Sequence, residues 1–193
     1  MPTDDLKQVV SEVAEVTSEE AKKEDENKEK LLVFALDDEE YAVNIAELQE
    51  IVPTTEITHV PNAPEFVKGI INLRGSIVVV VDLEKRFHLE RKGDKKQNHI
   101  IVAEVAGNRF GISVDSVEEI LKVAAKEIQE TPDLVSSKIN ADYLKGVVVL
   151  KERLVILLDL QKLLQEKELL SLGDSLKETE KINTNTKKIT KNS

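Results

Sequence analysis

The sequence contains no cysteine among its 193 residues. Without a thiol, the chain cannot form a disulfide framework, a thiolate metal site or a cysteine nucleophile. Tryptophan is also absent, and only two tyrosines and four phenylalanines are present. This shortage of aromatic rings argues against a platform on which nucleic-acid bases could stack. Several classes of site are therefore excluded before any motif is considered.

No apolar run reaches the roughly 18–20 residues that a membrane-spanning helix needs. Residues 1–5 lack the basic and apolar regions of a secretory signal, so we predict a cytoplasmic protein. The 37 acidic side chains outnumber the 27 Lys and Arg, which gives a formal net charge of −10. This excess of acid argues against general nucleic-acid binding, because phosphate contacts need clustered cations.

The two ends of the chain differ in composition from the middle. Residues 1–30 contain ten acidic and five basic side chains, and we expect an acidic segment that is partly helical or disordered. Its apolar residues fall at helical spacing: Leu6, Val9, Val10, Val13 and Val16. Residues 165–193 are expected to contain the end of a C-terminal helix and a disordered polar tail.

The middle of the chain repeats itself. Residues 41–51 match residues 110–120, and residues 67–83 match residues 144–160, in the same order. Two copies of a long period favour paired small barrels over a solenoid array. A closed barrel also suits short strands with alternating apolar residues, because closure removes exposed edges.

We therefore predict a mostly β fold of two five-stranded β-barrel subdomains, with short helices and a C-terminal helix. The first subdomain spans about residues 31–90 and the second about 98–158, within a domain of residues 31–164. An exchange of terminal segments between the two subdomains stays open.

Residues 67–83 contain two apolar, β-branched runs around a short polar break, which predicts a hairpin. Gly75 suits the turn because a residue without Cβ adopts positive φ at little cost. Asp82 ends the second strand and is expected to cap a short helix. Residues 143–150 and 153–158 predict the second hairpin, and a terminal amphipathic helix begins at Asp159.

The remaining elements follow from hydrophobic periodicity. Strands are expected at residues 31–36, 41–45, 56–60, 99–105, 109–114 and 122–128. A short helix is expected from Asn44 or Ile45, since Ile45, Leu48 and either Ile51 or Val52 share one face before Pro53 ends it. The matching residues of the second copy predict another helix, lined by Val114, Val117, Ile120 and Leu121.

The turns of the two hairpins differ. Arg74-Gly75 in the first copy becomes Lys151-Glu152 in the second. A turn needed only for folding could be the same in both copies, so the asymmetry favours a binding role for Arg74, with ordinary turn variation as the alternative. We also predict that Glu50 forms a bidentate ion pair with Arg74 and fixes the helix against the turn.

The sequence gives little support to an enzymatic function. The sequence has no phosphate-cradling glycine loop and no serine nucleophile motif. His59, His88 and His99 lack metal-ligand spacing. Asp82 and Asp159 recur in the duplication before predicted helices, so capping explains both better than a phosphoacceptor role. We predict no enzyme, no cofactor and no metal; a hydrolase or metalloprotein is the disfavoured alternative.

Three motifs occur together in the first half: Leu48-Gln49-Glu50-Ile51, Phe66-Val67-Lys68-Gly69 and Asn72-Leu73-Arg74-Gly75. At this spacing, residues 31–164 resemble the CheW family of bacterial chemotaxis coupling proteins. The resemblance implies SH3-like barrels. It also implies an adaptor that links the cytoplasmic tips of methyl-accepting chemotaxis receptors to the regulatory domain of the histidine kinase CheA. A CheW-like scaffold of a non-chemotaxis kinase pathway is the alternative.

The resemblance also implies binding residues at matching positions. Leu32 and Ile45 match apolar positions along the groove where the receptor tip docks. Leu48 and Glu50 match the helix after the second strand, and Arg74 with Gly75 matches a turn involved in receptor and kinase contact. Ordinary core packing is the alternative for Ile45 and Leu48. The family role implies recruitment to membrane receptor arrays, with no membrane insertion and no nucleic acid.

Overall fold

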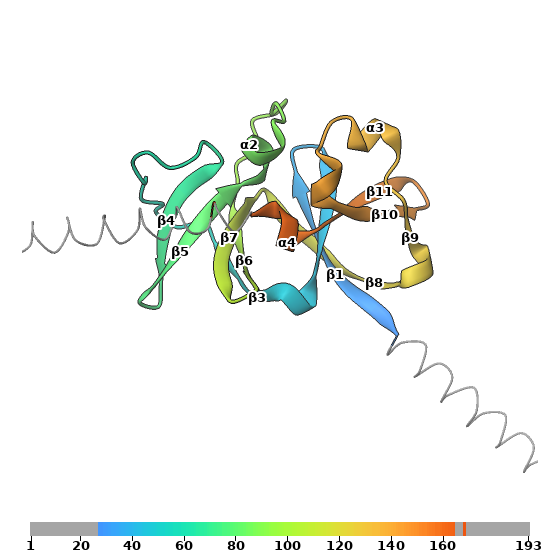
Figure 1. Ribbon diagram of the computed structural model, residues 1–193, viewed down its shortest axis with the longest axis horizontal. Helices are drawn as coiled ribbons and strands as arrows, with labels where there is room; N and C mark the ends of the chain where they lie inside the picture. The colour runs from blue at the N-terminus through green and yellow to red at the C-terminus, as the bar shows by residue number, and fades with distance from the viewer. Residues whose placement is uncertain (1–26, 165–167, 169–193) are drawn as a thin grey trace, which may run out of the picture.

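The computed structural model describes residues 27–164 and residue 168. Our expectations for residues 1–26, 165–167 and 169–193 lie outside this part of the chain. The described residues form two β-sheets connected by short helices (Figure 1). The mostly β fold is therefore confirmed, whereas the division into SH3-like barrels over residues 31–90 and 98–158 stays a prediction.

The first sheet has six strands in the order β8-β1-β2-β11-β10-β9. Its strands are β1 (Lys28–Leu36), β2 (Glu39–Asn44), β8 (Ser116–Ala124), β9 (Ile128–Gln129), β10 (Leu144–Leu150) and β11 (Arg153–Leu158). The second sheet has five strands in the order β3-β6-β7-β5-β4. Its strands are β3 (Leu48–Pro53), β4 (Val67–Leu73), β5 (Ser76–Asp82), β6 (His99–Val105) and β7 (Asn108–Val114).

Short helices lie between the strands: η1 (Ile45–Glu47), α2 (Leu83–Phe87), η2 (Ala125–Glu127), α3 (Asp133–Ser136) and η3 (Ala141–Tyr143). A further short helix, α4 (Leu160–Leu163), follows β11. Asp82 caps α2 by accepting hydrogen bonds from the Glu84 and Lys85 amides, as predicted. Asp159 caps α4 by accepting a hydrogen bond from the Gln161 amide.

The two sheets do not follow the two halves of the repeat. Strands β1 and β2 join the sheet that contains β8 to β11, while β6 and β7 join the sheet that contains β3 to β5. The pairings β2–β11 and β5–β7 are parallel, and the other pairings between named strands are antiparallel. Each half therefore contributes its first hairpin to the sheet of the other half.

The same backbone geometry recurs at one position of each half. Gly69 has a φ of +148° and Gly146 a φ of +154°, values that side-chain-bearing residues rarely adopt. A Cβ at Gly69 would lie 2.3 Å from the Thr58 carbonyl oxygen, and one at Gly146 would lie 2.5 Å from the Gln129 carbonyl oxygen. In both hairpins, glycine is required because a neighbouring chain segment approaches closely.

The largest core cluster contains side chains from both sheets, among them Phe34, Ile112 and Ile156. Aromatic rings stack across this core from Phe34 to Tyr41 and from Tyr41 to Phe87. Each sheet also contains one smaller cluster of buried hydrophobic side chains. The core therefore ties the two sheets together and fixes the position of their surface residues.

Two predicted helices are strands in the structure. Residues 48–53 form β3, where exposure alternates along the strand and Ile51 pairs with Ile101. Residues 116–124 form β8, which pairs with β1. Each expected helix is reduced to a single 3₁₀ turn or is absent, because backbone pairing with a strand distant in sequence outweighs a weak local helical pattern.

Two predicted strands are also wrong in extent. Residues 56–60 contain only an isolated bridge between Thr58 and Ile70. Residues 122–128 divide into the end of β8, η2 and the start of β9. Both hairpins and the strands around residues 31–36, 41–45, 99–105 and 109–114 are confirmed, with shifts at their ends.

Candidate protein-binding site

The predicted ion pair between Glu50 and Arg74 is present. Arg74 Nη2 lies 2.9 Å from Glu50 Oε2, and Arg74 Nη1 donates to Glu50 Oε1 at 3.3 Å. The Arg74 side chain is 78% exposed, whereas that of Glu50 is 17% exposed. The pair is bidentate, but it joins strand β3 to the hairpin turn rather than a helix to the turn.

A second arginine, missed by sequence reasoning, contacts the same carboxylate. Arg109 in β7 places Nη2 3.2 Å from Glu50 Oε1. Strand β6 lies between β3 and β7, so only the sheet order brings these side chains together. We define Glu50, Arg74 and Arg109 as the arginine clamp. Two guanidinium groups around one half-buried carboxylate fix its orientation.

The turn that presents Arg74 has an unusual backbone. Arg74 has a φ of +50° and Gly75 a φ of +83°, so two successive residues occupy the left-handed region. The Asn72 side-chain carbonyl accepts a hydrogen bond from the Gly75 amide at 2.9 Å. This geometry is that of a tight hairpin turn, and it holds Arg74 at the tip.

The predicted apolar site residues differ in accessibility. Leu32 is 3% exposed and packs in the core, so its side chain is not at the surface. Ile45 and Leu48 are partly buried against the same core cluster. Ile120, which sequence reasoning placed on a helix, is 56% exposed and lies opposite Leu32 in the β1–β8 pairing. We define Ile45, Leu48 and Ile120 as the apolar strip.

Lys68, part of the Phe-Val-Lys-Gly motif, lies in an internal polar network. Its ammonium donates to Gln97 Oε1 at 2.5 Å and to Ser113 Oγ at 3.1 Å, and burial lowers the pKa of this lysine. Gln97 also donates to Glu84, which forms an ion pair with Arg91. These contacts attach the charged connector before β6 to the five-stranded sheet.

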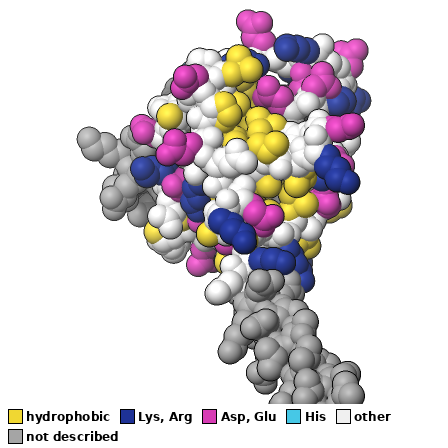
Figure 2. Space-filling model, turned by 90° about the vertical axis from the view of Figure 1, so that its right-hand side faces the viewer, with side chains coloured by type: hydrophobic (Ala, Val, Ile, Leu, Met, Phe, Trp, Pro, Cys, Tyr) yellow, Lys and Arg dark blue, Asp and Glu magenta, His cyan; other side chains and the backbone are white. Residues whose placement is uncertain are grey.

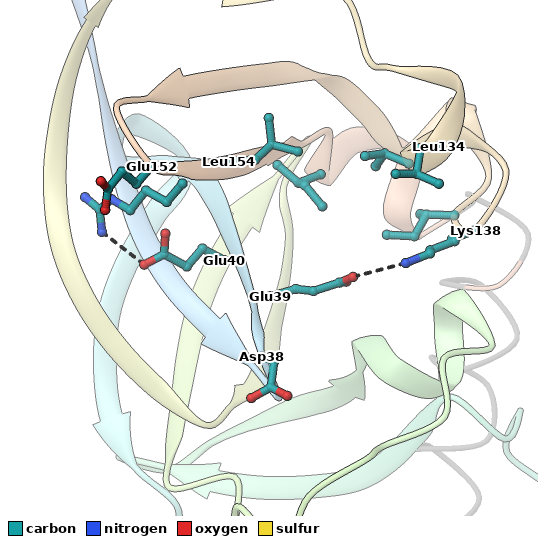
Figure 3. A pocket seen from close by; sticks show the side chains of 11 residues that line it. Asp38, Glu39, Glu40, Leu134, Lys138, Glu152 and Leu154 are labelled. Atoms are coloured by element: carbon teal, nitrogen blue, oxygen red, sulfur yellow. Dashed lines mark hydrogen bonds and ion pairs between the residues drawn. The ribbon is translucent and has the colours of Figure 1, made fainter.

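A separate groove of about 530 Å³ lies beside α3. Its floor contains Leu154 and Ile156 of β11, and Leu134 at its edge is 73% exposed. Figure 3 shows the charged side chains around this floor, including Glu39 opposite Lys138 and Glu40 beside the second hairpin. On the face shown in Figure 2, hydrophobic side chains form a patch with acidic and basic side chains around it.

The described residues contain no group of three or more His, Cys, Asp or Glu side chains that could hold a metal ion. Within the same residues, no helix is both long enough and apolar enough to cross a bilayer. The described surface carries an arginine clamp and exposed apolar side chains, two features that are typical of protein-binding sites.

The described residues thus form a small, mostly β domain of two sheets. Residues 30–168 match the model of the CheW-like domain, and the chain belongs to this family. It is 35% identical to the chemotaxis protein CheW of Klebsiella aerogenes over 73% of this chain and 84% of that protein. It is 33% identical to CheW of Thermotoga maritima over 70% of this chain and 87% of that protein.

A solved structure has the same fold. The scaffolding protein TtCheW from Thermoanaerobacter tengcongensis aligns with a TM-score of 0.65 and 34% sequence identity. The alignment covers 72% of this chain and 88% of that one. The predicted resemblance to the CheW family is therefore confirmed.

Proposed function

We propose that this protein is a chemotaxis adaptor that couples receptors to a kinase through protein contacts and without catalysis. Its partners are the cytoplasmic tip of a methyl-accepting chemotaxis receptor and the regulatory domain of the histidine kinase CheA. Membership of the CheW-like family supports the pathway. The arginine clamp is the structural observation that best supports a contact at this surface.

The clamp combines exposure with a fixed orientation. Arg74 is mostly exposed, yet a bidentate contact to Glu50 and a tight turn restrict its position. A preoriented arginine loses less side-chain entropy on binding than a mobile one, and arginine is enriched at binding hot spots. Arg109 adds to this effect because it also contacts Glu50, at Oε1.

The apolar strip suits a helical partner. A receptor tip made of helices presents apolar side chains at helical spacing, and such a face needs an apolar surface with a polar rim. Ile45, Leu48 and Ile120 supply the apolar part, while Leu32 supports Ile120 from the core. Binding to receptors would recruit the protein from the cytoplasm to membrane receptor arrays.

The proposal can be tested by measuring binding to two baits from the same organism, a receptor signalling-tip fragment and the CheA regulatory domain. Since the chain has no cysteine, one introduced cysteine allows labelling for fluorescence anisotropy. We expect the native chain to bind both baits. Arg74→Ala and Arg74→Lys should retain the fold by circular dichroism but weaken binding to at least one bait.

Lys151→Ala is the matched control, because Lys151 occupies the equivalent turn of the second hairpin. It should leave binding to the receptor fragment unchanged. Native protein that bound neither bait would contradict the proposal and leave a CheW-like scaffold of another kinase pathway as the alternative. Equal loss in the Arg74 and Lys151 variants would contradict the assignment of the contact to the clamp.

A further inference from the structure

The groove beside α3 has an apolar floor that continues along the second hairpin. Leu154 and Ile156 line the floor, and Leu134 at the edge is 73% exposed. Val149 lies directly opposite Leu154 in the β10–β11 pairing and is 55% exposed. Directly opposed residues of an antiparallel pair project from the same face, so Val149 extends the apolar surface beside Leu154. Contiguous exposed apolar surface of this kind is typical of binding sites.

The rim of this groove is acidic. Its lining contains two cations, Lys138 and Arg153, and four carboxylates, which gives a formal charge of −2. The carboxylates are those of Asp38, Glu39, Glu40 and Glu152. Both cations are already paired with acids, and Arg153 contacts Glu119 as well as Glu40. Glu40 Oε2 is buried without a hydrogen-bond partner, and Glu152 forms no hydrogen bond or ion pair with a described residue. A basic ligand with some apolar side chains would complement this surface.

We propose that the basic C-terminal segment of this same chain, residues 181–191, docks in the groove beside α3. The segment contains four lysines and no acidic residue, although the whole chain has a net charge of −10. Ile182 and Ile189 are its apolar side chains and suit the floor of the groove. The other end of the chain has the wrong sign for this rim, because residues 1–26 contain nine acidic and three basic side chains.

The connection of the chain favours this occupant over a separate molecule. Arg86 of α2 holds Glu168 by two hydrogen bonds of 2.8 Å. Glu84 of the same helix lines a smaller cavity, which shares three lining residues with the groove. The thirteen residues from 168 to 181 can extend about 43–47 Å, more than the diameter of about 30 Å of a small domain. A tethered ligand has an effective concentration of about millimolar, so even weak attraction produces docking.

Docking would occupy a surface that contains none of the residues assigned to the receptor contact. The inference therefore goes beyond the proposed function and does not depend on it. The docked segment would keep basic segments of other molecules out of the groove. Since part of the attraction is between exposed charges, added salt would weaken it.

Paramagnetic relaxation in the full-length chain tests the docking directly. A nitroxide attached at Thr186→Cys lies within the segment and replaces neither a lysine nor an isoleucine, and the sequence supplies no competing thiol. We expect broadened amide resonances for residues 134–138 and 152–156, with less broadening at high salt. The same label at Ser11→Cys, in the acidic N-terminal segment, is the control and should leave these resonances sharp.

Variants separate the charge of the groove from its apolar surface. Glu152→Lys reverses an exposed carboxylate of the rim and should remove most of the broadening. Glu56→Lys makes the same change in net charge at an exposed position of the loop before β4, and β4 and α3 lie on opposite sides of the molecule in Figure 1. This control should leave the broadening unchanged. Leu134→Ser should weaken it by removing an apolar contact, and Lys187→Glu with Lys188→Glu should abolish it without altering the described domain.

Four results would overturn the proposal. The first is the absence of broadening at the groove. The second is an equal loss of broadening in the Glu152→Lys and Glu56→Lys proteins, which would indicate an effect of net charge alone. The third is broadening centred on residues 48–53 of β3, because the segment would then lie on the other sheet. The fourth is broadening of isotope-labelled chains mixed with nitroxide-labelled chains, which would identify a second copy as the occupant.

Discussion

Arg109 Nη2 lies 3.2 Å from Glu50 Oε1, although strand β6 separates the strands of the two residues. The Arg109 side chain is 32% exposed, less than half as exposed as that of Arg74. Its Nε is buried and has no hydrogen-bond partner among the described residues. Glu50 contacts both arginines, and this makes its carboxylate the central group of the clamp.

The first prediction compares the two sides of the clamp. Arg74→Ala breaks an exposed pair and should lower the free energy of unfolding by only about 0.2–1 kcal/mol. Glu50→Ala should lower it by about 1–3 kcal/mol, because the half-buried Arg109 also loses its partner. Urea unfolding of both variants measures the difference. Equal losses of unfolding free energy in the two variants would show that the contact between Arg109 and Glu50 does not stabilise the protein.

The second prediction concerns the glycines of the repeat. Gly69→Ala and Gly146→Ala should each destabilise the protein by about 2–5 kcal/mol, since both backbone strain and a clash with a carbonyl oxygen result. Gly75→Ala and Gly107→Ala are matched controls in left-handed turns with nothing within 4 Å of the new Cβ. These controls should lose about 1 kcal/mol.

Urea unfolding at equal m-values is the measurement for the four glycine variants. Similar losses of unfolding free energy at all four positions would mean that the close approach at Gly69 and Gly146 does not affect stability.

The third prediction concerns a buried arginine that holds the end of the domain. Arg86 donates to the Leu163 carbonyl at 3.0 Å and makes two hydrogen bonds of 2.8 Å to Glu168, while its guanidinium lies 4.2 Å from the Phe66 ring centre. Arg86→Ala should lower the free energy of unfolding by roughly 2–4 kcal/mol. Arg86→Lys should recover less than half of this lost free energy, because an ammonium cannot make a planar bidentate contact.

Lys85→Ala on the same helix is the control for Arg86. Lys85 is exposed, so the change should stay within about 0.5 kcal/mol. Thermal unfolding compares the variants. An Arg86→Ala protein with the same melting temperature as the Lys85→Ala protein would refute the predicted role of Arg86.

The fourth prediction is a pH dependence from Glu47. Burial raises the pKa of this carboxyl above its ordinary value of 4.5, and the nearby Lys145 opposes the rise. The folded state therefore binds the proton more tightly than the unfolded state. The Glu47 contribution to stability is present below pH 4.5 and is lost as the pH rises through the folded-state pKa. Glu47→Gln should remove this loss, so stability near neutral pH should be equal or higher.

Denaturant unfolding between pH 4 and pH 7 measures the Glu47 effect. Lys145→Met should make the loss larger, because removing the opposing charge raises the folded-state pKa of Glu47 further. A Glu47→Gln variant with the same pH profile as the native chain would contradict the prediction.

Features that depend on local chemistry could be predicted from the amino-acid sequence. Paired apolar runs around Arg74-Gly75 predicted the hairpin, since its turn requires positive φ. Asp82 and Asp159 predicted helix caps, because a carboxylate accepts from the first free amides of a helix. The motif spacing also identified the family, and the bidentate contact of Arg74 with Glu50 followed from two residues of that pattern.

Features that depend on partners distant in the chain could be read only from the folded structure. Residues 48–53 and 116–124 have spacings compatible with a helix or a strand, and pairing with β6 and β1 selected the strand. Sheet order brought Arg109 to Glu50, and packing buried Leu32 while it left its cross-strand neighbour Ile120 exposed. Hydrogen bonding between strands and burial between sheets join residues far apart in the chain, so no local pattern specifies them.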